Sequence, residues 1–280
     1  MSLTVNRRRF MTLAAGAAAV PLLAPAFTET AWAQSVEDLK SRGTLRIGVL
    51  SELPPWGFLD ETGKPAGYDV DVGNLLATKM GVPVEFVGMT VAARIAQLMT
   101  GKVDVLLATM GMYPDRAKVV QFSKPYASLD IILLAKKATK IEKIEDAKTL
   151  RIAVTRGAAQ DTAITKALGE GADIKRYDDD SAAIQAFIAG QVDALGANTT
   201  YMININKIFP NNDFEQKLSF NRQFMGIAMK PGNKELNTFL NSFIDEIKAN
   251  GELEAINKKW IGIPLVQFPE KLEGVPFTVE

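Results

Sequence analysis

The sequence predicts an α/β protein with two similar lobes. A segment with apolar residues on one helical face, 90–99, leads into an unbroken apolar run at 103–107, which has the length of a buried parallel strand. The same pattern returns with an offset of 89 residues, because residues 183–198 repeat residues 94–109. Two helix–strand units of one design indicate two lobes, which would close like a clamshell on a small ligand.

Polar residues follow the two repeated strands at equivalent positions. Thr109 matches Asn198, each just past its strand, and Gly111 and Arg116 follow Thr109. Ligands of open α/β sheets bind outside the carboxyl ends of the strands. These residues are therefore candidates for gripping an anion. Alternatively, Arg116 could cap a turn, and Asn198 could begin the following helix.

Residues 1–33 are predicted to be an export signal outside the fold. Three arginines and a phenylalanine at 7–10 precede an apolar run at 11–27, and an Ala-x-Ala cleavage site ends at Ala33. Two prolines interrupt the apolar run, which disfavours a membrane span. The arginine run resembles the twin-arginine export signal, with an ordinary export signal as the alternative.

Charge and composition exclude several classes of function. Beyond residue 33 the chain has 29 basic and 31 acidic residues, so it has no excess of positive charge that would attract nucleic acid. It has neither cysteine nor histidine, which removes the commonest metal ligand and general base. We therefore expect no metal, no cofactor and no nucleic-acid partner. The chain is long enough for two lobes, each with its own core.

The first lobe is predicted to alternate helices and strands. Its expected elements are a Ser-capped helix at 35–42, strands at 45–50 and 82–87, a helix at 69–80 capped by Asp69, a helix beginning after Thr90, and the strand at 103–107. This alternation favours a parallel sheet with right-handed crossovers. Trp56, which two prolines hold just past a strand end, is expected to line the cleft, with a core position as the alternative.

An extended run after Arg116 is a candidate hinge into the second lobe. Asp178, Asp179 and Asp180 are expected to form a solvated turn with helix-capping acids. The tail from residue 262 is expected to lie across the surface or to hang free. The other expected elements are strands at 131–135, 151–154 and 224–229, a helix ending at 169, and helices at 235–249 and 252–260.

Several motifs in order carry a resemblance to a known family. They are GTLRIGV at 43–49, PAGYDVDV at 65–72, GKVDVLLATM at 101–110, Pro-Asp-Arg at 114–116 and FSKPY at 122–126. Together they resemble the polar amino acid-binding proteins of ABC transporters, the family-3 extracellular solute-binding proteins. The resemblance runs from about residue 43 to residue 260.

The resemblance implies a type II periplasmic-binding-protein clamshell, whose parallel-sheet lobes are joined by two hinge strands. The first lobe would comprise 36–127 plus 226–280, and the second 128–225. The protein would be a monomeric periplasmic receptor of an ABC importer, with an inner-membrane permease as partner. Its ligand would be an amino acid or a related carboxylate, acidic ones included. The alternative is an enzyme on the same fold that resembles cyclohexadienyl dehydratases.

The resemblance also implies roles for particular residues. Arg116 would grip the ligand's α-carboxylate. Thr109 and Gly111 would help to hold its amino group and carboxylate, and Trp56 would stack on the ligand. Arg94 fits the place of an arginine that pairs with the side-chain carboxylate in binders of acidic amino acids. The alternative for Arg94 is a helix-surface cation with a solvated head.

The chain departs from the family pattern at three places. Gly111 stands where the family has a hydroxyl-bearing residue, and Ala158 and Ala159 replace the hydroxyls of a turn in the second lobe. Asn198 replaces the acid that pairs with the ligand's ammonium group. A cleft without that acid should favour a ligand with two anionic groups and at most a neutral or modified amino group.

Overall fold

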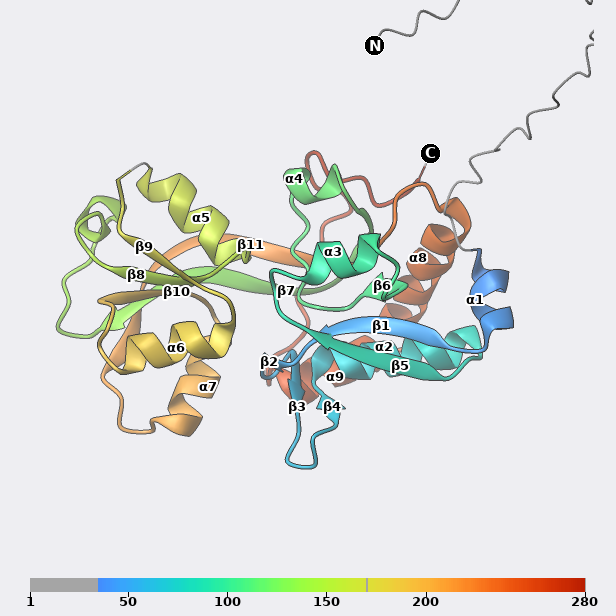
Figure 1. The fold of residues 1–280 in the computed structure, drawn as a ribbon, viewed down its shortest axis with the longest axis horizontal. Coiled ribbons are helices and arrows are strands. Elements are labelled where there is room, and N and C mark those ends of the chain that lie inside the picture. The colour runs from blue at the N-terminus through green and yellow to red at the C-terminus, as the bar shows by residue number, and fades with distance from the viewer. Residues whose placement is uncertain (1–34, 170, 280) are drawn as a thin grey trace, which may run out of the picture. The chain divides into compact units, whose positions relative to one another are not determined.

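A computed structural model of the protein describes residues 35–169 and 171–279. The predicted export signal, residues 1–33, lies outside this part of the chain. In the described part, eight strands form one main sheet in the order β5-β1-β6-β11-β7-β10-β8-β9 (Figure 1). Three short strands form a second sheet, β2-β3-β4. None of the helices described is long and apolar enough to span a bilayer.

We call the elements gathered at one end of the long strands β7 (Gln121–Lys136) and β11 (Phe214–Met229) the first lobe, on the right in Figure 1. Its main strands run parallel, as the alternation of helices and strands predicts. The strands are β1 (Leu45–Leu50), β5 (Val84–Met89) and β6 (Val105–Leu106), with β2 (Glu52–Leu53), β3 (Gly57–Leu59) and β4 (Pro65–Ala66) in the small sheet. The helices are α1 (Val36–Arg42), α2 (Tyr68–Met80), α3 (Arg94–Met99), α4 (Pro114–Ala117), α8 (Lys234–Ala249) and α9 (Glu252–Trp260).

The second lobe lies at the other end of β7 and β11 (Figure 1) and is also built on parallel strands. Its strands are β8 (Ile152–Thr155), β9 (Ile174–Tyr177) and β10 (Ala194–Asn198). Its helices are α5 (Ala159–Leu168), α6 (Asp180–Ile188) and α7 (Tyr201–Ile208), with a short 3-10 helix, η1 (Ile144–Ala147).

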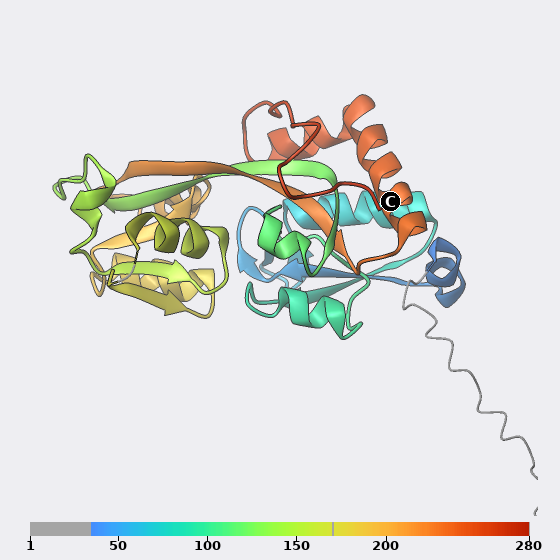
Figure 2. The same ribbon diagram turned by 90° about the horizontal axis from the view of Figure 1, so that it is seen from above.

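Two long antiparallel strands, β7 (Gln121–Lys136) and β11 (Phe214–Met229), join the lobes. Figures 1 and 2 both show the pair running from one lobe into the other. Each strand has 16 residues, so the expected strands at 131–135 and 224–229 are segments of longer ones. The lobe boundaries that the resemblance implies, 127/128 and 225/226, fall inside these strands.

The two repeated helix–strand units have the same local structure. α3 and α6 are each followed by a glycine in the left-handed conformation, Gly101 with φ 76° and Gly190 with φ 71°, a conformation that only glycine adopts readily. Asp104 and Asp193 then accept the backbone N–H groups of Arg46 and Arg151 at 2.8 and 2.9 Å. The two aspartates of the repeat therefore have a structural role, because each accepts a hydrogen bond from the backbone beside it.

Several expected element boundaries are wrong. α3 begins at Arg94 and not after Thr90, and the second strand runs at 84–89 instead of 82–87. α2 begins after Gly67, so Asp69 lies inside the helix and does not cap it. The tail from residue 262 was expected to lie across the surface or to hang free, and it takes the first of these courses: it packs on the first lobe, where Val275 and Phe277 are buried and the Phe277 carbonyl accepts the side-chain amide of Asn241 at 2.7 Å.

Candidate functional site

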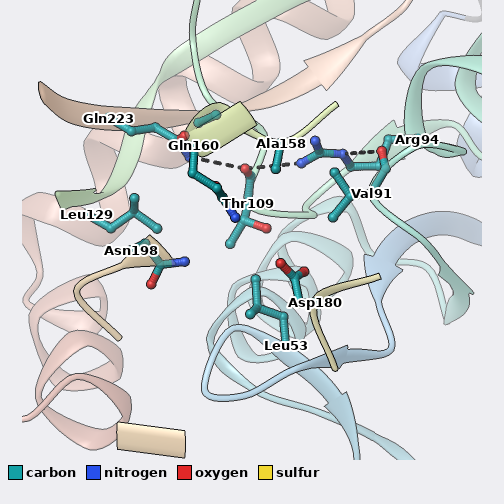
Figure 3. A pocket seen from close by; sticks show the side chains of 11 residues that line it. Leu53, Val91, Arg94, Thr109, Leu129, Ala158, Gln160, Asp180, Asn198 and Gln223 are labelled. Carbon is teal, nitrogen blue, oxygen red and sulfur yellow. Dashed lines mark hydrogen bonds between the residues drawn. The ribbon is translucent and has the colours of Figure 1, made fainter. Parts of the chain in front are cut away.

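A small cavity lies between residues of the two lobes, beyond the ends of the repeated strands (Figure 3). Its volume of about 20 Å³ is room for roughly one water molecule. It collects side chains from the turn after β6, the starts of α5 and α6, and the end of β10. The lining residues are Leu53, Val91, Arg94, Thr109, Leu129, Ala158, Ala159, Gln160, Asp180, Asn198 and Gln223.

Of the residues predicted from the sequence to bind the ligand, four line this cavity and three do not. The four that line it are Arg94, Thr109, Ala159 and Asn198. Arg116, Gly111 and Trp56 are not among the lining residues. Each of these three nevertheless contacts a residue of the opposite lobe or a residue that lines the cavity.

Thr109 stands at the cavity in a strained backbone conformation. Its φ is +48°, in the left-handed region that costs a residue with a Cβ roughly 1–2 kcal/mol. Hydrogen bonds hold this conformation: the Thr109 N–H donates to Asp69 Oδ2 at 2.9 Å, and its carbonyl accepts Arg94 Nη1 and Gln223 Nε2, each at 3.2 Å. Three neighbours on separate elements therefore stabilise the strained backbone conformation of Thr109.

Arg94 is buried at the cavity wall, with 4% of the residue exposed. Its guanidinium donates to the carbonyls of Val91 at 2.9 Å and Ala108 at 2.8 Å, and to that of Gly157 in the second lobe at 3.4 Å. The pKa of Arg94 is lowered to about 9, mainly by burial and then by the nearby Arg116 charge, while Asp180 and Asp69 oppose the shift. The alternative of a solvated surface cation is wrong.

Arg116 bridges the two lobes beside the cavity. Its guanidinium donates to the Gly111 carbonyl at 3.1 Å and to the Gly157 carbonyl at 2.9 Å, and it stands over the Tyr113 ring at 5.2 Å. Burial lowers the pKa of Arg116. Because Arg94 donates to the same Gly157 oxygen, two guanidinium groups converge on one acceptor of the opposite lobe.

Gln223 takes the space that a side chain at Gly111 would need. A Cβ on Gly111 would lie 2.6 Å from Gln223 Cδ and 2.7 Å from the Tyr113 ring. Gln223 is 4% exposed, and among the described residues its Oε1 has no hydrogen-bond partner. An orphaned buried acceptor is costly, so Gln223 is suited to receive a donor from a ligand.

Trp56 is fully buried and acts on the site only through another residue. Its ring lies 5.0 Å from that of Tyr68, and its Nε1 donates to Thr200 Oγ1 at 2.9 Å. Thr200 in turn donates through its N–H and its hydroxyl to Asn198 Oδ1, at 2.9 and 2.5 Å. Leu53, not Trp56, lines the cavity, so the expected stacking position is not found for Trp56.

Asn198 is buried, and its side-chain orientation is set by Thr200. Both hydrogen bonds from Thr200 end on Oδ1, which is the turn geometry typical of Asn before a helix. The amide nitrogen is directed into the cavity (Figure 3). Asn198 therefore both precedes α7 and lines the site, and what it offers there is a donor.

Asp180 lines the cavity, a position that the sequence analysis missed. Asp179 caps α6, because its side chain accepts the Ala182 N–H at 2.7 Å, whereas Asp180 is only 4% exposed. Asp180 Oδ1 accepts the hydroxyls of Thr155, at 2.7 Å, and Tyr201. Burial raises the pKa of Asp180, while these two donors and the Arg94 charge oppose the shift. The expectation of a solvated turn is wrong for this residue.

Asp69 is a second buried carboxyl group, behind the cavity wall. It accepts the Thr109 N–H and, at 2.7 Å, the Tyr126 hydroxyl. Burial raises the pKa of Asp69 to about 7, against the opposing effects of Tyr126, the Thr109 N–H and the Arg94 charge. Because both oxygens are engaged within the first lobe, Asp69 positions Thr109 and does not face a ligand.

The arrangement is suited to binding a small molecule with charges of both signs. The cavity wall presents a cation, an anion and neutral donors and acceptors, all held by hydrogen bonds within the protein. No group of three or more His, Cys, Asp or Glu residues able to hold a metal ion occurs in 35–169 and 171–279.

Known binding proteins are similar to this chain over most of its length. The L-cystine-binding protein TcyJ of Escherichia coli strain K12 is 28% identical over 226 residues, which are 80% of this chain and 85% of the relative. The L-arginine-binding protein of Pseudomonas aeruginosa is 28% identical over 228 residues, 77% of this chain and 87% of the relative.

Solved structures of similar sequence share the fold. The receptor for L-cysteine of Neisseria gonorrhoeae matches with a TM-score of 0.76 at 29% identity, covering 81% of this chain and 93% of that one. An ancestral amino acid-binding protein, described as a precursor of cyclohexadienyl dehydratase, matches with a TM-score of 0.74 at 30% identity, covering 80% and 98%. The fold is thus that of type II periplasmic binding proteins, as the family resemblance implies.

The family model for bacterial extracellular solute-binding proteins, family 3, matches residues 45–263, which span both lobes, both joining strands and the whole cavity lining. The two lobes, the polar strand ends that meet between them and this match agree, and the chain belongs to the family-3 bacterial extracellular solute-binding proteins.

Proposed function

We propose that the protein is a periplasmic receptor that captures an amino acid by closure of its lobes and delivers it to an inner-membrane permease of an ABC importer. The observation that carries the proposal is the cavity at the matching strand ends, which both Arg94 and Asp180 line. The relatives named above are binding proteins, which supports a receptor rather than an enzyme. We propose that it acts as a monomer.

The ligand's carboxylate is proposed to take the place of the Gly157 carbonyl between Arg94 and Arg116. Two guanidinium groups that converge on one oxygen form a geometry suited to a carboxylate, which can accept from both. The N-terminus of α5, which has no side-chain cap, adds the backbone N–H groups of Ala159 and Gln160 on the same side. Thr109, Gly111 and Trp56 would support this subsite through the contacts described above.

Capture requires the lobes to separate and close again. A cavity of about 20 Å³ holds no amino acid, and ligand sites usually enclose roughly 300–1,000 Å³. The contacts that would open are hydrogen bonds between lobes, among them Arg116 to Gly157 at 2.9 Å and Trp56 to Thr200 at 2.9 Å. The long strands β7 and β11 are the candidate hinges, because they are the two strands that enter both lobes.

A periplasmic receptor has to be exported. We propose that residues 1–33 direct the chain out of the cytoplasm, through the twin-arginine route, and are cleaved near Ala33. Replacing Arg7 and Arg8 together by Lys should then abolish export while leaving the folded precursor in the cytoplasm. Cell fractionation checks this, and unchanged export of the variant would point to the general secretory route.

A thermal-shift screen of the twenty amino acids and cystine tests the proposed function. A ligand present at 100 times its Kd adds about 2.7 kcal/mol to the free energy of unfolding, which is an easily measured rise in melting temperature. We expect at least one amino acid to stabilise the protein and to be recovered chemically unchanged by mass spectrometry. Stabilisation by none contradicts the proposal.

The enzyme alternative rests on one observation, the structural likeness to the ancestor of a dehydratase. That ancestor is itself described as amino acid-binding, so the likeness fits a receptor as well. Incubation with cyclohexadienyl carboxylates, the substrate class that the name of the dehydratase implies, separates the two. Product that accumulates in proportion to protein and time would favour the enzyme.

A further inference from the structure

We propose that Asp180 is the acceptor of the ligand's α-ammonium group, so that the site requires a free amino acid and rejects the corresponding carboxylate without an amino group. This inference rests on the proposed function, because it concerns the same cavity. It reverses the expectation from the sequence, which found no anion in the cleft and therefore favoured a ligand without a free ammonium group.

The carboxylate of Asp180 has one oxygen committed to the protein and one left for a ligand. Oδ1 accepts the Thr155 hydroxyl at 2.7 Å and the Tyr201 hydroxyl. None of the hydrogen bonds found among the described residues ends on Oδ2, while Asp180 lines the cavity and its carboxylate points into it (Figure 3). Two hydroxyls thus fix the orientation of the group without occupying its second oxygen.

Asn198, at the position of the family's usual acid, is unable to take this role. It carries no charge, and its only acceptor atom, Oδ1, already receives two hydrogen bonds from Thr200. An amide oxygen has two lone pairs, so the side chain offers the ligand N–H donors alone. An ammonium group needs acceptors, which moves its site away from Asn198.

The site of Asp180 has the electrostatics that an ammonium acceptor needs. It stands 4% exposed at the start of α6, across the cavity from the buried guanidinium of Arg94. A zwitterion placed between them puts its carboxylate toward Arg94 and Arg116 and its ammonium toward Asp180. Each buried charge then has a partner, which is the condition under which buried ions are tolerated.

Matched pairs of ligands test the inference by calorimetry on the wild-type protein. The pairs differ only in the α-ammonium group: L-glutamine and glutaramic acid, L-glutamate and glutarate, L-cysteine and 3-mercaptopropionate, and L-arginine and 5-guanidinopentanoate. We expect the amino acid of a binding pair to bind at least about 30-fold more tightly than its partner, the loss typical of an unpaired buried charge. Equal binding overturns the inference while leaving the proposed function in place.

The variant Asp180→Asn locates the effect. Asn keeps the shape and an oxygen for the Thr155 and Tyr201 hydroxyls, but it removes the charge. The amino acid should lose at least about 30-fold in affinity, whereas its deaminated partner should not lose affinity. Asp178→Asn is the control, because it makes the same charge change at an exposed position two residues away and should bind like the wild type.

Each remaining outcome decides between the two claims. Full amino acid affinity in Asp180→Asn overturns the assignment of Asp180 but not the receptor function. If the thermal-shift screen identifies an amino acid outside these four, that amino acid and its deaminated counterpart form the tested pair, and stabilisation by none of the compounds screened overturns both claims. If Asp180→Asn does not fold, the comparison of paired ligands on the wild type still decides whether the ammonium group is recognised.

Discussion

Replacing Asp69 by Asn should make the stability of the protein depend differently on pH. Asp69 is fully buried, and burial raises its pKa to about 7 from an ordinary value of 3.8. The folded protein therefore holds this proton more tightly than the unfolded chain does. It follows that the contribution of Asp69 to the free energy of unfolding is greatest below pH 4 and is lost as the pH rises to about 7.

The size of the effect follows from the two pKa values. Each pH unit between them costs about 1.4 kcal/mol, so the ionised carboxyl destabilises the folded state by about 4 kcal/mol above pH 7. Asn removes the titration but keeps the hydrogen bonds, since its oxygen can accept the Thr109 N–H and its nitrogen can donate to the Tyr126 hydroxyl. Relative to the wild type, Asp69→Asn should therefore gain about 4 kcal/mol between pH 4 and pH 7.

Urea unfolding of both proteins at several pH values between about 4 and 8 measures this difference. Tyr126→Phe provides a second check, because the Tyr126 hydroxyl lowers the pKa of Asp69 and its loss should move the transition to higher pH. A difference between wild type and Asp69→Asn that stays constant with pH would refute the reasoning, since Asp69 would then ionise as it does in the unfolded chain.

Three further substitutions have defined outcomes. Arg116→Ala should weaken amino acid binding by about 30-fold to several thousand-fold in calorimetry. Arg116→Lys should recover little of the lost affinity, because a point charge does not copy the guanidinium fork. Lys118→Ala, which changes an exposed neighbour, should bind normally. Gly111→Ala should lower the free energy of unfolding by about 1–3 kcal/mol in urea titrations, since its Cβ would lie 2.6 Å from Gln223 Cδ; unchanged stability would show that Gln223 moves freely. Trp56→Phe should cost about 1 kcal/mol of stability through the lost hydrogen bond to Thr200, and a variant as stable as the wild type would contradict that contact.

The sequence predicted the fold because its signals are local and repeated. Apolar periodicity, the glycines at 101 and 190, and the aspartates at 104 and 193 define two equivalent units without any knowledge of long-range contacts. The same repeat located Thr109 and Asn198 at equivalent strand ends. The lengths of β7 and β11 were underestimated, because polar and charged residues interrupt the apolar pattern of both strands outside 131–135 and 224–229.

The parts of the site that the sequence missed depend on contacts between distant residues. Asp180 stands in a run of three aspartates, and only the capping of α6 by Asp179 turns Asp180 inward. Asp69 bonds to Thr109, which is 40 residues away, and Gln223 bonds to Thr109 across 114 residues. The sequence feature that could have identified Asp180 as a site residue is its position directly after the acid that caps α6, at the helix end that faces the predicted cleft.

A crystal structure with the amino acid that the thermal-shift screen identifies tests the central claim most directly. The account predicts the ligand between the lobes, its carboxylate bound by Arg94 and Arg116 and its ammonium within hydrogen-bonding distance of Asp180. It also predicts that the Gly157 carbonyl no longer accepts from both arginines. A ligand bound outside the residues that line this cavity, or one whose ammonium group points away from Asp180 toward solvent, would contradict it.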